Sequence, residues 1–291
     1  MPQHDVTARD RDSRVVGSPG RRRIIGRFGT APAAVILMVL AGCAGGPPPG
    51  RVPPAGTAGI IQPDMPPGYE ARLAVHLDRR DAAPRAAQGR WLAGSGNHLL
   101  VSAHYGPLVP LMALAVDVDS LYLNLNRQNL FARADSIALL HEGRVRVSAA
   151  TAGSWLRSVL EPHRLTGLLD RTTAIERDGL RILRGAVGPR RSGLVAEVWI
   201  DVAAGRVRKW TLDEGGGHRL MLVEYPVEDW AADDDLPPAV QISWPDQGAV
   251  MVVRLTRFSP RETAPSARRF RLDRPPDARE VDLASPVDPL L

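Results

Sequence analysis

Short segments in which apolar residues recur at every second position run through most of this chain and constrain its fold. In residues 69–77 the positions 71, 73, 75 and 77 are apolar, whereas Arg72 and His76 fall on the opposite face. This period of two residues is typical of a strand with one buried face. About eleven such segments, separated by turn residues, predict a mainly β fold with an antiparallel barrel or sandwich. They cover residues 69–77, 86–93, 97–105, 119–126, 129–135, 179–187, 194–202, 205–213, 218–226, 239–245 and 249–258.

Two of these segments are apolar on both faces. In an antiparallel sheet with one solvent-exposed face, apolar and polar residues should alternate more cleanly. Residues 220–225 and 250–255 show this pattern. Either another element covers the second face, or the sheet curls around an apolar cavity. The cover is predicted in residues 151–170, the one region with helical spacing of apolar residues. There the candidate N-cap is Ser154, and Pro162 is expected to end or kink the helix.

The chain contains a single cysteine, Cys43, inside the stretch AAVILMVLAGCAGG at residues 33–46. One cysteine cannot form an internal disulfide or a structural zinc site. It is therefore a buried inert residue, a reactive nucleophile or a site of covalent modification. A basic segment at 21–27 and a short apolar run precede it, which is the layout of a secretory signal peptide. The arginines at 21–23 leave Sec and twin-arginine export both open.

The four residues Leu40, Ala41, Gly42 and Cys43 resemble the bacterial lipobox. That resemblance implies cleavage before Cys43, a diacylglyceryl group on its sulfur, and an acyl chain such as palmitate on the new amino terminus. An ordinary signal peptide with an incidental cysteine is the alternative.

The net charge excludes a generally basic, nucleic-acid-binding protein. Residues 1–42 hold seven arginines and three aspartates and so contribute +4 of the formal net charge of +5. The remainder carries only +1, and no strongly basic segment is left to contact nucleic acid.

Composition divides the chain into four parts. Residues 1–42 are predicted to be a lipoprotein signal peptide, and residues 43–68 a lipidated cysteine followed by a tether rich in proline and glycine. Such a segment is an extended, solvated spacer. Residues 69–285 are predicted to form one domain, and residues 286–291 a tail.

Three stretches of this domain resemble the LolA/LolB-like periplasmic lipoprotein-binding family. They are residues 106–135 with GPLVP and DSLYLNLNRQ, residues 197–214 with EVWIDVAAGRV, and residues 236–245 with LPPAVQISWP. The resemblance spans residues 69–285 and rests on the order of weak motifs. It implies an antiparallel half-barrel of about eleven strands whose apolar concave face is covered by a short helical insert.

The resemblance also singles out the apolar stretch GPLVPLMAL at residues 106–114. In LolB-like receptors a protruding apolar loop between early strands helps to take up an acyl chain, and this stretch has the corresponding place in the chain. Its two prolines predict a loop or strand entry with exposed apolar side chains. The alternative is that Leu108, Val109 and Leu111 fold back into the core. The lipid-binding candidates, from this stretch and the helical insert, are Leu108, Val109, Leu111, Met112, Trp155, Leu156 and Val159.

Catalytic and metal-binding patterns are not evident in the sequence. It has no Gly-x-Ser-x-Gly elbow, no His-Glu-x-x-His and no phosphate-binding glycine loop, and its seven histidines are scattered. The acidic run 228–235 lacks the spacing and the glycine of a calcium loop. We therefore expect no enzymatic activity, no catalytic residue, no cofactor and no metal.

Two functions remain open. The first is a membrane-anchored lipoprotein that binds acyl chains or lipoproteins in its cavity. The second is an envelope scaffold with a filled core that binds a protein partner. Ala44 follows the cysteine where an aspartate would retain many lipoproteins at the inner membrane. By that analogy the protein is expected on the periplasmic face of the outer membrane.

The lipobox resemblance makes a direct prediction. Replacing Cys43 by serine should move the protein from the membrane fraction to the soluble fraction, because no diacylglyceryl group can attach. Fractionation of cells and the intact mass of the unaltered protein measure this, with Gly45→Ser as the control that should stay in the membrane. Membrane association that persists in Cys43→Ser would contradict the assignment of an anchor.

Overall fold

The computed structural model describes residues 63–106, 109–139, 145–187, 193–231 and 234–283. The predicted signal peptide, the lipobox and most of the tether lie outside these residues. The strands are β1 (Gly68–Arg79), β2 (Ala82–Ala93), β3 (Leu99–Tyr105), β4 (Val109–Val116), β5 (Leu121–Leu125), β6 (Leu130–Ala134), β7 (Ser136–Leu139), β8 (Val145–Ser148), β9 (Asp170–Arg177), β10 (Leu180–Ala186), β11 (Leu194–Asp201), β12 (Arg206–Glu214), β13 (Arg219–Glu224), β14 (Ala239–Trp244), β15 (Ala249–Arg261) and β16 (Arg279–Glu280). The helical elements are α2 (Ala149–Leu160) and the 3₁₀ helices η1 (Pro162–Leu168), η2 (Val227–Asp229), η3 (Pro245–Gln247) and η4 (Ala267–Phe270).

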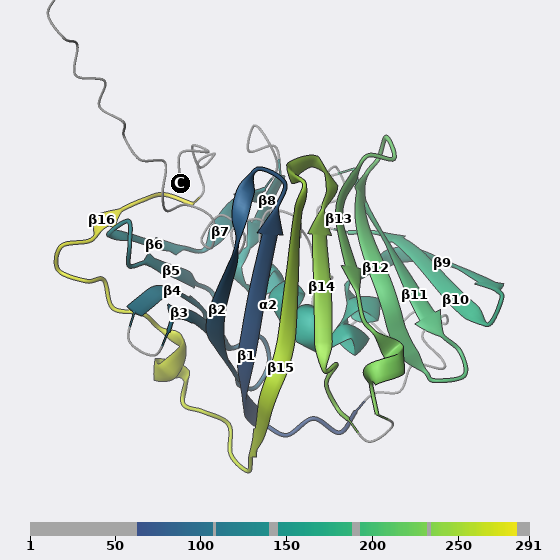
Figure 1. Cartoon of the computed structure of the whole chain (residues 1–291), viewed down its shortest axis with the longest axis horizontal. Helices are drawn as coiled ribbons and strands as arrows, with labels where there is room; N and C mark the ends of the chain where they lie inside the picture. The colour runs from purple at the N-terminus through teal and green to yellow at the C-terminus, as the bar shows by residue number, and fades with distance from the viewer. Residues whose placement is uncertain (1–62, 107–108, 140–144, 188–192, 232–233, 284–291) are drawn as a thin grey trace, which may run out of the picture.

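One large open sheet dominates the fold (Figure 1). Its fourteen strands, counted over the described residues, run in the order β16-β6-β5-β4-β3-β2-β1-β15-β14-β13-β12-β11-β10-β9. Neighbours are antiparallel except for the short pair of β16 and β6. The long strands β1 and β15 pair at the centre and join the start of the domain to its C-terminal part. The strands β7 and β8 form a separate pair.

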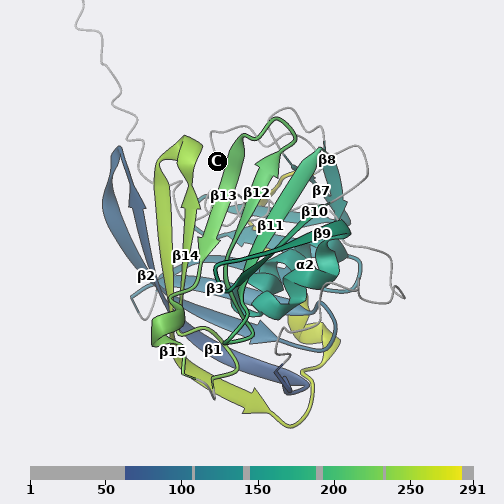
Figure 2. The ribbon, with the colours of Figure 1, turned by 90° about the vertical axis from the view of Figure 1, so that its right-hand side faces the viewer.

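The large sheet curls around α2, as Figure 2 shows. Irregularities in strand register support the curvature, since a bulge bends a strand and increases its twist. They occur between Arg72 and Leu73 of β1 and between Ala103 and His104 of β3. The sheet ends at β16 and β9 and does not close into a barrel. The predicted antiparallel, helix-covered and open architecture is therefore confirmed.

The predicted number of about eleven strands is wrong, because the described residues form sixteen. The stretch that was predicted to be a loop or strand entry, residues 106–114, instead contributes most of strand β4. Pro110 is tolerated there because it precedes Met112, the first residue of β4 that pairs with β5. The strands β7, β8 and β16 are too short to show a period, and β9 (DRTTAIER) lacks an apolar face.

The helix was predicted correctly in kind but too late in its start. Its N-cap is Ser148, whose hydroxyl accepts a hydrogen bond from the Thr151 amide at 3.2 Å. Ser154, the expected cap, lies inside the helix and donates its hydroxyl to the Ala150 carbonyl. The first turn reads AATAG, whose small residues carry no apolar period. Pro162 ends α2 and opens η1, as expected. Among the described residues no helix is long and apolar enough to cross a membrane.

A C-terminal segment covers part of the outer face of the sheet. The Phe270 ring stacks on His98, just before β3, with 5.0 Å between ring centroids, and Arg271 Nε donates to Asp117 Oδ2 at 2.6 Å. Ala278 closes a small second core with Phe131 of β6. The segment therefore shields strands β3 to β6 from solvent.

Close packing of α2 on the sheet depends on a glycine. A Cβ atom at Gly153 would lie 2.7 Å from Val116 Cγ1 and 3.1 Å from the Asn97 carbonyl oxygen. Gly153→Ala should therefore lower the free energy of unfolding by about 1–3 kcal/mol, although alanine favours helices elsewhere. Gly167→Ala is the matched control in η1, where a Cβ meets nothing within 4 Å. Urea unfolding measures both, and equal stability of the two variants would contradict the packing argument.

Candidate functional site

A cavity of about 550 Å³ lies between α2 and the concave face of the central strands. Almost all of its wall is apolar. From the sheet come Leu73, Val75 and Leu77 of β1, Ala87, Gly89 and Trp91 of β2, Val101 and Ala103 of β3, Leu111 of β4, Ile242 of β14, and Met251 and Val253 of β15. The helix adds Leu156, Val159 and Leu160.

Small residues along β2 and β3 create the space. Register places Gly89 opposite Leu73 of β1 and opposite Ala103 of β3, all on the concave face. Ala87 lies two residues further along the same face of β2. A Cβ atom at Gly89 would lie only 3.3 Å from that of Leu73, so this position holds no larger side chain without rearrangement.

The other half of the concave face is filled. Trp155 of α2 is buried against Trp210 of β12, with 5.6 Å between ring centroids. Leu156 and Val159 point to the hollow half. The helix thus presents one apolar face to a packed core and another to the cavity.

Exposure along the cavity wall locates its mouth. The hairpins β1–β2, β3–β4 and β5–β6 all turn at one end of the sheet. At this hairpin end the cavity is lined by Arg85, Tyr105 and Arg127, and Tyr105 is 66% exposed. At the opposite end its lining residues Trp91 and Val101 are buried. We call the hairpin end the mouth of the cavity.

A buried polar cluster fixes α2 at the closed end. Glu161, fully buried just after the helix, accepts hydrogen bonds from Tyr69 Oη at 2.7 Å and from Arg157 Nη2 at 2.6 Å. Arg164 Nε donates to its second carboxylate oxygen. Arg157 Nη1 in turn donates to the carbonyl oxygen of Gly94 at 2.7 Å, in the β2–β3 connection. The cluster therefore joins the helix to β1 and to the turn after β2.

Charge neutralisation in the cluster outweighs the cost of burial. Burial alone would raise the pKa of Glu161, but the charges of Arg157 and Arg164 and the hydrogen bond from Tyr69 hold it below its ordinary value of 4.5. Burial lowers the pKa of nearby His163 to about 4, so this imidazole is neutral at pH 7. The fold therefore requires Glu161 in its ionised form.

A second contact holds the helix on the filled side. Tyr225 Oη donates to the Ser158 carbonyl oxygen at 3.2 Å and accepts from Trp210 Nε1 at 3.2 Å. Both bonds are buried. The helix is therefore attached to both halves of the sheet.

The structure distributes the predicted lipid-binding residues over three environments. Leu111, Leu156 and Val159 lie on the cavity wall. Met112 and Trp155 are buried in the core but do not line the cavity, and Val109 is 49% exposed at the start of β4. Leu111 therefore folds back into the interior, as the alternative held for it, whereas Val109 does not. The remaining predicted residues, Leu40, Ala41, Gly42, Cys43 and Leu108, lie outside the described residues.

Sequence reasoning missed the contribution of β2 to the cavity. Its segment AAPRAAQGRWLA places Arg85, Ala87, Gly89 and Trp91 on one face. The signal is a run of small residues at alternate positions, which weakens the apolar period that marks a strand. Read as a strand, the same run indicates missing side-chain volume on the concave face.

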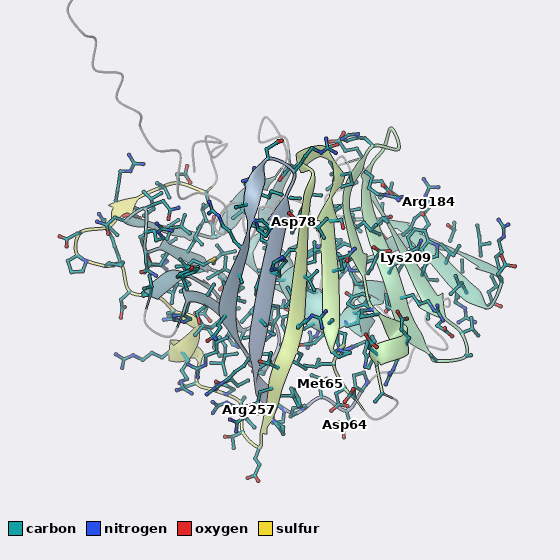
Figure 3. The ribbon with its side chains drawn as sticks, in the orientation of Figure 1. Asp64, Met65, Asp78, Arg184, Lys209 and Arg257 are labelled. Atoms are coloured by element: carbon teal, nitrogen blue, oxygen red, sulfur yellow. The ribbon has the colours of Figure 1, made fainter. Side chains whose placement is uncertain are left out.

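The outer face of the sheet is polar by comparison. A second hollow of about 580 Å³ over β12 to β15 is lined by charged residues of both signs, including Lys209, Glu224 and Arg254. Lys209 Nζ lies 4.6 Å from the centre of the Trp199 ring, and Figure 3 shows Lys209 and Arg184 on this face. Over the described residues, no three His, Cys, Asp or Glu side chains gather in a geometry that could hold a metal ion.

Solved structures share this architecture. No protein-family model and no curated protein matches the sequence. A LolA superfamily protein from Nitrosomonas europaea superposes with a TM-score of 0.51 at 13% identity, over 75% of this chain and 94% of that one. The fold is LolA-like. A DUF1329 family protein from Desulfovibrio piger gives a TM-score of 0.48 at 11% identity, over 72% of this chain and 91% of that one.

A domain assigned to outer membrane lipoprotein sorting from Vibrio parahaemolyticus gives a TM-score of 0.45 at 13% identity, over 66% of this chain and 84% of its own. The superposition on the Nitrosomonas europaea protein confirms the resemblance inferred from sequence for the LolA-like fold. Identities this low establish a common architecture and leave the ligand of this chain to be argued from its own residues.

The buried cluster predicts a specific loss of stability. Glu161→Gln should lower the free energy of unfolding at pH 7 by about 3 kcal/mol, because Arg157 stays buried without its counter-charge. The carboxylate has a lowered pKa in the folded state, so its contribution is complete above pH 4.5 and is lost as pH falls through that lower value.

The difference in stability between the unaltered protein and Glu161→Gln should therefore shrink below pH 4.5. Urea unfolding at several pH values measures it. Glu176→Gln is the control, because Glu176 makes an exposed ion pair with Arg181 on β10 and should change stability by less than about 1 kcal/mol. A pH-independent difference would contradict the assigned role of the charge.

Proposed function

We propose that this protein is a membrane-anchored bacterial lipoprotein that shelters an acyl chain of a lipid or lipoprotein in its cavity. The observation that carries the proposal is the apolar cavity of about 550 Å³ beneath the concave face of a LolA-like sheet. Pockets for small ligands are mostly apolar and occupy about 300–1,000 Å³. The protein takes part in lipid or lipoprotein handling in the cell envelope and has no catalytic role.

The energetics of acyl-chain burial support such a carrier. Each methylene moved out of water is worth about 0.8 kcal/mol. A cavity walled by residues such as Leu73, Val159 and Met251 offsets part of the chain's affinity for a bilayer without any covalent step. The scaffold alternative assumed a filled core, and the hollow beside α2 favours the carrier.

The proposed anchor agrees with this role. The lipobox and the tether before the domain would hold the protein at the periplasmic face of the outer membrane while the spacer gives the domain reach. The cavity would then receive chains from, or deliver them to, a neighbouring membrane or envelope protein.

Filling the cavity tests the function. The full chain carrying Cys43→Ser is purified, and lipids are extracted from it and measured by mass spectrometry per mole of protein. Ala87→Trp places an indole into the cavity from the concave face of β2 and should remove most of the bound lipid. Gln88→Trp is the matched control, because the next residue along β2 is exposed and points to the opposite face.

Circular dichroism and the midpoint of thermal unfolding show whether both variants fold. Co-purified lipid in the unaltered protein and in Gln88→Trp, with little in a folded Ala87→Trp, would support the carrier. Equal lipid content in Ala87→Trp and Gln88→Trp would sink the proposed site. A protein that carries no lipid and takes up no added palmitate would favour the scaffold.

A further inference from the structure

Two arginines stand at the mouth of an otherwise apolar cavity. Arg85 lies on the concave face of β2, directly opposite Leu77 of β1, and is partly exposed. Arg127 is exposed in the turn between β5 and β6. They are the only charged residues among those that line the cavity, counted over the described part of the chain. Tyr105, at the end of β3, lies between their strands.

Neither arginine is neutralised by the described protein. Several arginines of the sheet have carboxylate partners, such as Arg90 with Glu70 at 2.7 Å and Arg208 with Asp201 at 2.5 Å. Arg85 and Arg127 form no ion pair and no side-chain hydrogen bond with any residue that the structure describes, and no acidic residue lines the cavity there. Their charges are therefore available to an anion, and guanidinium groups match carboxylate and phosphate oxygens well.

The cavity volume sets the number of chains that fit. An apolar protein cavity of about 150 Å³ accommodates benzene, which corresponds to roughly 25 Å³ for each carbon. By this measure the 550 Å³ here hold about 20 carbons. That is one long acyl chain. Two such chains of about 16 carbons each would leave roughly a third of their carbons outside, and three would leave more than half.

The shape of the wall agrees with one extended chain. Arg85, Ala87, Gly89 and Trp91 follow one another on a single face of β2, from the exposed mouth to the buried end. Six residues of strand span about 20 Å. A chain lying along this column would have its head at the arginines and its methyl end near Trp91.

We infer that the cavity binds a single-chain lipid with an anionic head, a carboxylate or a phosphate, held at the mouth by Arg85 and Arg127. This inference rests on the proposed acyl-chain carrier and specifies its ligand class. The chain supplies the burial energy, and the arginines select the head and its orientation. Lipids with an uncharged head, or with two long chains, bind more weakly.

Equilibrium dialysis of the full chain carrying Cys43→Ser tests the inference. The labelled probes, each used below its aggregation concentration, are palmitate, palmitoyl-lysophosphatidylglycerol, hexadecanol and dipalmitoyl-phosphatidylglycerol. Palmitate and the lysolipid distinguish a carboxylate from a phosphate head, hexadecanol lacks the charge, and the last probe adds a second chain. The variant Arg85→Gln with Arg127→Gln should bind the anionic single-chain probes about tenfold more weakly and hexadecanol unchanged.

A charge-matched control lies on the outer face of the sheet. Arg72 of β1 and Arg257 of β15 are exposed. They lie opposite each other on the two neighbouring strands, away from the cavity (Figure 3 labels Arg257). Replacing both by glutamine changes the net charge equally and should leave all affinities unchanged. Thermal unfolding establishes that both double variants fold.

The outcomes separate the inference from the function on which it rests. Tighter binding of either anionic single-chain probe than of hexadecanol, lost in the double variant at the mouth but kept in the control, supports the inference. Equal binding of hexadecanol and the anionic probes, equal binding of the two-chain lipid, or no effect of the arginines overturns it and leaves the carrier intact. Failure of all four probes to bind overturns the carrier as well.

Discussion

The buried carboxylate of Glu161 is the interaction on which the arrangement of this molecule depends. It lies just after helix α2. Its charge is neutralised by arginines of the helical segment, and it accepts a hydrogen bond from Tyr69 of β1. Through Arg157 the same cluster reaches the turn after β2. A charge buried this deeply is costly unless every partner is in place. The cluster therefore specifies one position of the helix over the sheet and closes one end of the curved fold.

The cavity follows from that fixed position together with an uneven distribution of side-chain size. On one side of α2 the large rings of Trp155 and Trp210 meet and fill the interior. On the other side Ala87, Gly89 and Ala103 leave space that the helix cannot enter, because both of its attachments hold it in place. Interiors of proteins are normally close-packed, and the proposed ligand site rests on this departure from close packing.

The sequence allowed the fold class to be predicted because the period of two is a local property of each strand. Pro162 also located the end of the helix correctly, whereas the start of the helix was placed too late. Strand β4 was missed because Pro107 and Pro110 in the sequence resemble a loop signal. The tolerance of Pro110 within the strand depends on which neighbours the strand pairs with. The cavity-lining role of β2 was missed for a related reason. Small residues are informative only when the facing wall is known, and that wall comes from β1, β3 and α2.

The direction of β1 has a geometric consequence for a protein tied to a surface by its leading segment. This strand begins beside the closed end, where Tyr69 reaches Glu161, and finishes at the mouth, where Leu77 faces Arg85. Its twelve residues span about 40 Å, and in Figure 3 Met65 and Asp78 lie toward opposite ends of the strand. Attachment through the residues before β1 would thus place the closed end nearer the surface and turn the opening toward the aqueous compartment.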